Sequence, residues 1–120
     1  MKEGSVVGFV LPSYMPTRAV EFYSKLFGWK SGKLEGAPIE FHTLQTPNKE
    51  VEGGVVPVLA PGQTQFIIIS VDSLEKKAED AVKLGAQVAL GRQELKGKGS
   101  LLILMDPDGN LFGLLESQGK

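Results

Sequence analysis

The chain has 120 residues, of which 42% are hydrophobic and 22% are charged, a composition typical of a globular domain with one core. Thirteen basic and fourteen acidic side chains give a net charge of -1, which provides no broad positive field for nucleic acid or an anionic membrane. The absence of cysteine excludes disulfides, thiolate metal sites and a cysteine nucleophile. The N-terminus lacks a signal-peptide pattern and no apolar run could span a bilayer, so we expect a cytoplasmic protein.

The chain begins with a predicted strand and a predicted helix. Residues 6–11 form an apolar run closed by Pro12, which is typical of an interior strand covered on both faces. A helix should follow, with Pro16 in its first turn and Gly28 as its left-handed C-terminal stop. Its apolar face has the i, i+3, i+4, i+7, i+8 spacing and consists of Ala19, Phe22, Tyr23, Leu26 and Phe27.

Three strands are expected between this helix and the middle of the chain. They cover residues 29–34, 39–46 and 51–59, with turns at 36–38 and 60–63. Gly53 and Gly54 lie inside the last of these strands. Paired glycines inside a strand indicate a bulge or a close approach of the backbone to another group.

The same order of elements recurs in the second half of the chain. Residues 66–71 predict a strand, and Asp72 or Ser73 can cap a helix that Gly85 ends. Three strands should follow at 86–90, 101–105 and 111–116, the last two joined by a tight turn at 106–110. The apolar face of the helix consists of Leu74, Ala78, Ala81 and Val82.

The two halves therefore form a repeat in their element order. A shift of 57 residues superposes Gly28 on Gly85 and Phe9 on Phe66, although few letters are identical. We expect a single domain over residues 1–120, with repeat one at about 5–59 and repeat two at about 65–117. An unrelated α+β sandwich with two helices would explain these periodicities equally well.

Two segments favour one known family. Residues 18–29, RAVEFYSKLFGW, resemble the first helix of the glyoxalase, bleomycin-resistance and extradiol-dioxygenase superfamily, the vicinal oxygen chelate superfamily. Residues 106–116, DPDGNLFGLLE, resemble its last hairpin and strand. The resemblance implies an α+β fold in which two βαβββ repeats form an open, cupped, eight-stranded mixed sheet. It also implies a small-molecule ligand on the concave side and a homodimer that completes the cup.

Metal-using members of this superfamily place a histidine or glutamine on the first strand of each repeat and a glutamate on its last strand. Carried over one position at a time, the first-strand positions fall on Gly8 and Phe66, and one last-strand position falls on Gly113. The remaining position lies within residues 54–56, where no side chain carries oxygen or nitrogen. The resemblance therefore implies the scaffold without its usual metal, and these residues favour room and apolar contact. Glu116 lies three residues beyond the ligand position and should face the other side, as a solvated or dimer-contacting carboxylate.

Three other polar features are candidates for function. His42, the single histidine, shares a strand face with Glu40 and is suited to act as an acid, a base or a pocket hydrogen bonder; otherwise it is a structural histidine. Glu52 should share a face with Gly54 and could reach the mouth of the cup, or be solvated there. Residues 96–99, KGKG, predict a hairpin turn with two exposed lysines.

Three classes of function remain open from the sequence. The first is a metal-free binding protein, similar to the drug-sequestering members of the superfamily, that encloses an apolar or aromatic small molecule in a cup at the dimer. The second is a lyase, isomerase, epimerase or dioxygenase that uses a divalent metal on His42, Glu40 and Glu52. The third is an interaction subunit without a ligand. We favour the first class, for which no cofactor, nucleic acid or membrane partner is expected.

The pocket predicted for this function combines strand residues from both repeats. Its residues are Gly8, Val10, His42, Glu52, Gly54, Val56, Phe66, Gly113 and Leu115. Aromatic rings could stack on a flat ligand in the same cup, Phe9 and Trp29 among them, although Trp29 is equally suited to core packing after the helix.

Overall fold

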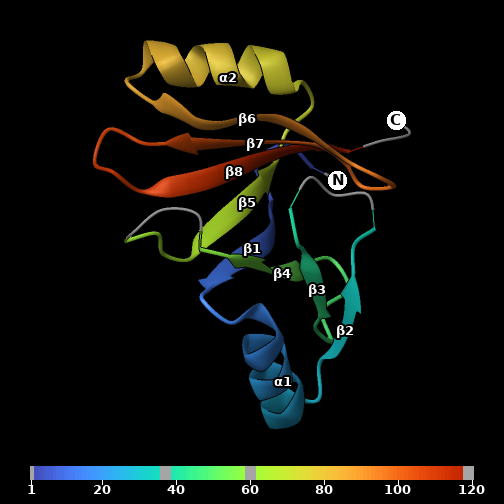
Figure 1. The fold of residues 1–120 in the computed structure, drawn as a ribbon. Helices are drawn as coiled ribbons and strands as arrows, with labels where there is room; N and C mark the ends of the chain where they lie inside the picture. The colour runs from blue at the N-terminus through green and yellow to red at the C-terminus, as the bar shows by residue number, and fades with distance from the viewer. Residues whose placement is uncertain (1, 36–38, 59–61, 118–120) are drawn as a thin grey trace.

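A computed structural model describes residues 2–35, 39–58 and 62–117 of the chain. They form one curved eight-stranded sheet with two helices, which lie at opposite ends of the sheet in Figure 1. The helices are α1 (Pro16–Phe27) and α2 (Leu74–Lys83). The strands are β1 (Val6–Ser13), β2 (Lys30–Lys33), β3 (His42–Gln45), β4 (Glu52–Pro57), β5 (Phe66–Ser70), β6 (Gln87–Leu95), β7 (Gly99–Met105) and β8 (Leu111–Ser117).

The sheet has the strand order β2-β3-β4-β1-β5-β8-β7-β6, in which the two halves of the chain repeat one arrangement. Each half pairs its first strand in parallel with its last strand, β1 with β4 and β5 with β8. The antiparallel pairing of β1 with β5 joins the halves at the centre of the sheet. The predicted α+β fold of two βαβββ repeats is therefore confirmed, and one chain supplies all eight strands.

Side chains on alternate strand residues define two faces of this sheet. We call the face that carries the helices the outer face: Phe9 of β1 contacts Trp29 beside α1, and Leu114 of β8 packs with α2. We call the opposite face the inner face. Its apolar core joins Leu34, next to the edge strand β2, with Leu95 of the other edge strand, β6. Because these strands lie at the two ends of the sheet, their contact with one core means that the inner face is concave.

Both helices begin and end where their sequence signals place them. Pro16 is the first residue of α1, and Gly28 ends it in the left-handed conformation with φ of 74°. At α2, the Ser73 side chain accepts a hydrogen bond from the Lys76 backbone N–H, and Gly85 follows the helix with φ of +107°. These features confirm the predicted caps.

Strand boundaries differ from the prediction in several places; β3, for example, begins at His42 instead of residue 39. β1 continues through Pro12, which has no backbone N–H to donate. The proline is tolerated because the pairing of β1 with β5 ends at Val10, so no β5 carbonyl needs a donor at this position. β6 extends to Leu95 instead of residue 90, because its polar residues pair with β7 and point to solvent. The turn predicted at 36–38 and the segment 59–61 lie outside the described residues. Within the described part of the chain, no helix is long and apolar enough to cross a membrane.

Candidate functional site

The inner face brings together every predicted pocket residue except His42. Gly8 and Val10 of β1 lie opposite Glu52 and Gly54 of β4. Across the central pairing, Val10 also lies opposite Phe66 of β5. Val56 packs in the same inner core, Leu115 packs against it, and Gly113 lies beside the inner residue Ile68. The strand register therefore supports one shared surface for these residues.

Apolar neighbours occupy the space beside the glycines of this surface. A Cβ atom at Gly54 would lie 2.6 Å from Cζ of Phe41, so the Phe41 ring rests directly on the strand. A Cβ at Gly113 would lie 3.3 Å from both Ile68 and Leu101. The expectation that these glycines leave room is therefore wrong, because they let larger side chains pack against the backbone.

The four positions that correspond to the superfamily's metal ligands cannot hold a metal ion. A side chain at Gly8 would place its Cβ 2.7 Å from the Glu52 carbonyl oxygen, and Phe66 is buried in the apolar core. No group of three or more His, Cys, Asp or Glu side chains among the described residues could hold a metal ion. The residues present therefore do not fit the metal centre of the superfamily, because convergent oxygen and nitrogen donors are missing.

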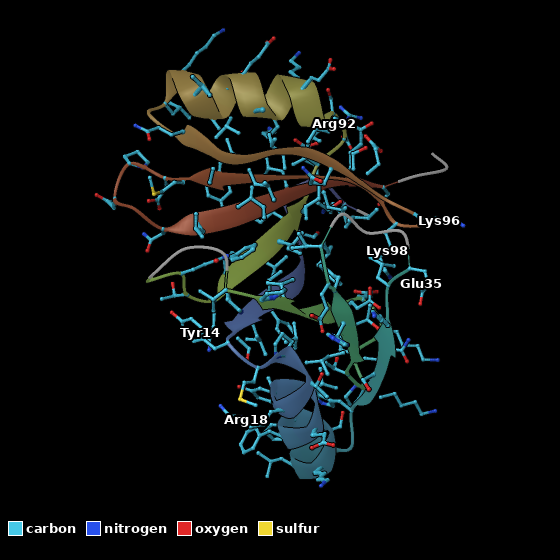
Figure 2. The ribbon with its side chains drawn as sticks, viewed as in Figure 1. Tyr14, Arg18, Glu35, Arg92, Lys96 and Lys98 are labelled. Atoms are coloured by element: carbon cyan, nitrogen blue, oxygen red, sulfur yellow. The ribbon has the colours of Figure 1, made fainter. Side chains whose placement is uncertain are left out.

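An ion pair at the inner face connects the β6–β7 hairpin with β4. Glu52 of β4 accepts a hydrogen bond from Lys98 Nζ at 2.5 Å, and both side chains are about one-third exposed. Figure 2 shows Lys98 near the body of the protein, whereas Lys96 points away at the tip of the β6–β7 hairpin. Of the two lysines predicted to be exposed, Lys98 instead connects the second repeat to the first.

His42 lies on the outer face and not with the other predicted pocket residues. It pairs with Val55, whose neighbours Gly54 and Val56 belong to the inner face. Its Nε2 lies 2.6 Å from Oε2 of Glu40, and 16% of its side chain is exposed. The predicted shared face of His42 and Glu40 is confirmed. The alternative metal set is divided by the sheet, because Glu52 lies on the inner face.

Glu116 lies on the outer face, as predicted, but it is not simply solvated. Its Oε1 accepts a hydrogen bond of 2.8 Å from the Leu74 backbone N–H, at the first residue of α2. Glu3 acts next to it, accepting from the Asp72 N–H at 2.8 Å and pairing with Lys77 at 2.9 Å. These carboxylates therefore hold the start of α2 and are not part of the inner-face site.

Several residues of the inner face were not predicted from the sequence. They are partly exposed apolar side chains that pack against its core, namely Leu34, Ile39, Phe41, Ile103 and Leu111. Strand alternation gave only part of the signal, since it separates Phe41 from His42 and groups Ile103 with Leu101. The registers of β3 with β4 and of β7 with β8 then place Phe41 and Ile103 on the same face as Gly54 and Gly113. The rings of Phe9 and Trp29, by contrast, pack with α1 on the outer face and cannot stack on an inner-face ligand.

Comparison with known proteins places this site in a known fold. A family model described as a glyoxalase-like domain matches residues 9–115. No curated protein matches the sequence. A hypothetical protein from Bacillus halodurans C-125 is structurally similar, with 15% identity over 99% of this chain and 98% of that chain and a TM-score of 0.75.

Two methylmalonyl-CoA epimerase structures are also similar. The protein from Mycobacterium tuberculosis has 13% identity, covering 98% of this chain and 89% of that one, with a TM-score of 0.66. The protein from Streptomyces coelicolor, in complex with 2-nitronate-propionyl-CoA, has 14% identity, covering 98% and 100%, with a TM-score of 0.71. At these identities the similarity establishes the fold alone. The family model, which covers most of the chain, shows that this chain belongs to the glyoxalase-like domain family of the vicinal oxygen chelate superfamily.

Proposed function

We propose that the protein binds an apolar or aromatic small molecule on its inner face without a metal ion. One observation carries the proposal. The positions at which metal-using relatives carry ligands fall on the inner face, where Gly8, Gly54, Phe66 and Gly113 surround an apolar core instead. Such a surface offers contact and desolvation to an apolar ligand but no Lewis acid for a reaction.

Two polar side chains of the inner face already have partners within the chain. The Thr43 hydroxyl donates to the Gly32 carbonyl oxygen at 3.3 Å, and Glu52 is paired with Lys98. These groups already have partners, so they attract no opposite charge from a ligand. The partly exposed Phe41, Ile103 and Leu111 remain for contact with it.

A homodimer is part of the same proposal. The sheet ends in two open edge strands, β2 and β6. In addition, Phe22 and Leu26 of α1 and Met15 just before it are exposed, with Phe22 57% and Leu26 59% exposed. Spacings of seven and four residues place these side chains on one face of the helix, which suits packing against a second helix. Sedimentation velocity at increasing concentration should show a dimer that Phe22→Ser weakens and Lys25→Ser does not. A monomer at every concentration would contradict the homodimer.

Binding is tested with Nile red, a neutral apolar dye, and a matched pair of variants. Ile103→Gln adds a polar group to the inner face, whereas Val88→Gln adds the same group at an exposed site of β6. We expect dye fluorescence to rise on addition of the protein, and the affinity to fall roughly tenfold in Ile103→Gln only. Equal affinity in the two variants would contradict an inner-face site.

The metal-dependent alternative is tested on protein purified without a chelator. Elemental analysis and thermal unfolding in the presence of added divalent ions report metal binding directly. We expect substoichiometric metal and an unchanged Tm. A stoichiometric ion with a Tm increase of several degrees would overturn the metal-free proposal.

A further inference from the structure

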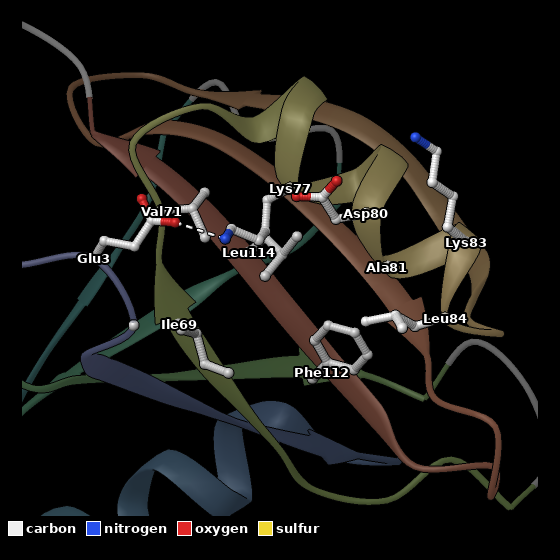
Figure 3. A pocket seen from close by; sticks show the side chains of 11 residues that line it. Glu3, Ile69, Val71, Lys77, Asp80, Ala81, Lys83, Leu84, Phe112 and Leu114 are labelled. Carbon is white, nitrogen blue, oxygen red and sulfur yellow. Dashed lines mark ion pairs between the residues drawn. The ribbon is translucent and has the colours of Figure 1, made fainter.

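A second candidate binding site lies on the outer face, on the opposite side of the sheet from the proposed cup. It is a cavity of about 640 Å³ between α2 and strands β5 and β8. Ile69, Phe112 and Leu114 form its floor, and Ala81 and Leu84 line it from the helix side (Figure 3). Its volume is within the usual range for small-molecule sites, roughly 300–1,000 Å³.

The cavity exists because repeat two lacks the aromatic side chains of repeat one. The shift that superposes Gly28 on Gly85 also places Tyr23 on Asp80 and Trp29 on Ala86. Beside α1, Trp29 stacks on Tyr23 at 6.0 Å between ring centroids and contacts Phe27 at 5.1 Å. The corresponding residues of repeat two have no rings, so space remains between helix and sheet.

The charges at the rim favour a neutral ligand. Glu3 and Lys77 form an ion pair of 2.9 Å on one side of the cavity. Asp80 and Lys83 contribute one charge of each sign to the remaining rim. The rim therefore has no net charge, and the floor has no polar side chain for orienting a charged group.

We propose that this outer cavity binds a neutral, planar aromatic molecule, which supplies to repeat two the ring that repeat one supplies from its own chain. The ring lies between the floor residues Ile69 and Phe112 and the helix residues Ala81 and Leu84. Contact between aromatic faces and edges adds to the burial of apolar area. This site is independent of the inner-face site, because the sheet separates the two.

The test uses indole as a neutral planar probe and maps its position by two-dimensional NMR. We expect indole to shift the amide signals of Ile69, Phe112 and Leu114 in a saturable manner. Shifts of inner-face residues such as Leu101 would report the separate inner-face site and should persist when the outer cavity is altered. Shifts confined to the inner face, or no shifts up to the solubility limit of indole, would overturn the outer site. An inner-face result would still agree with the proposed function, so the two failures are distinguishable.

A matched pair of variants tests the role of the missing ring. Asp80→Tyr introduces at the rim the residue of repeat one, while Glu79→Tyr introduces the same ring and the same charge change at an exposed neighbouring position. We expect Asp80→Tyr to weaken indole binding roughly tenfold or more, with Glu79→Tyr close to the original protein. Both positions are exposed, so folding should persist, and circular dichroism checks it. Equal indole affinity in the two variants would contradict the proposal.

Discussion

The two helices cover equivalent regions of one sheet but pack against it differently. Beside α1, the rings of Phe9, Tyr23 and Trp29 fill the space, and none of the twelve residues of α1, all of them described, is fully buried. Beside α2, packing depends on aliphatic side chains, with Leu74 and Leu104 almost completely buried. The repeat therefore preserves the backbone arrangement, while each half fills its helix layer with different side chains.

The helix ends differ in the same way. α1 starts after Met15 without a side-chain cap. Around the start of α2, backbone N–H groups donate hydrogen bonds to the side chains of Ser73, Glu116 and Glu3. Repeat two thus anchors its helix by polar contacts at one end, which leaves its C-terminal half free to border the outer cavity.

The largest effect is expected at the aliphatic layer of repeat two. Leu104→Ala removes a side chain with 0% exposure and should lower the free energy of unfolding by about 3 kcal/mol, because it leaves a cavity beneath α2. Urea unfolding measures the change, with Val88→Ala, half exposed, as the control. A loss no larger than that of the control would mean that α2 does not depend on this core.

A smaller loss is expected at the aromatic layer of repeat one. Trp29→Ala removes three ring contacts but a partly exposed side chain, so we expect a loss of about 2 kcal/mol. Trp29→Phe keeps part of the stack and should recover much of it. Near-ultraviolet circular dichroism and urea unfolding report both variants. If Trp29→Ala unfolded like the original protein, the rings would not stabilise this layer.

The polar anchor of α2 is tested at Glu116. Glu116→Ala leaves the Leu74 N–H without its carboxylate acceptor and should cost about 1 kcal/mol, the usual value for a helix cap. Glu21→Ala, on the exposed side of α1, is the control. Similar unfolding midpoints for these two variants would show that the contact to Leu74 does not stabilise α2.

The smallest effect is a pH dependence at Glu3. The hydrogen bond from Lys77, with help from the Asp72 N–H, lowers the pKa of this carboxyl from its ordinary value of 4.5. A lowered pKa in the folded state gives stability that is present above the ordinary pKa and is lost as pH falls through the lowered value. The difference in stability between the original protein and Glu3→Gln should therefore be present at neutral pH and vanish in strong acid. A difference independent of pH would contradict this origin.

The sequence by itself determined the element order and the repeat. Helix spacing in residues 19–27, the stops at Gly28 and Gly85 and the apolar first strands are local signals, because they depend on backbone sterics and on which residues share a face. Alternation within strands also predicted that Glu52 and Gly54 share a face, and that Glu116 does not lie with Gly113. These predictions hold because a strand has a fixed period of two residues.

The tertiary structure alone decided what touches these faces. The pair of Glu52 and Lys98 joins residues 46 positions apart, and the Phe41 ring on Gly54 depends on the register of β3 with β4. The placement of His42 on the outer face likewise follows from that register. Such contacts cannot be read from neighbouring letters, because sheet curvature brings distant strands together. Whether a helix layer is filled or hollow depends on the volumes that meet there, rings beside α1 and alanines beside α2.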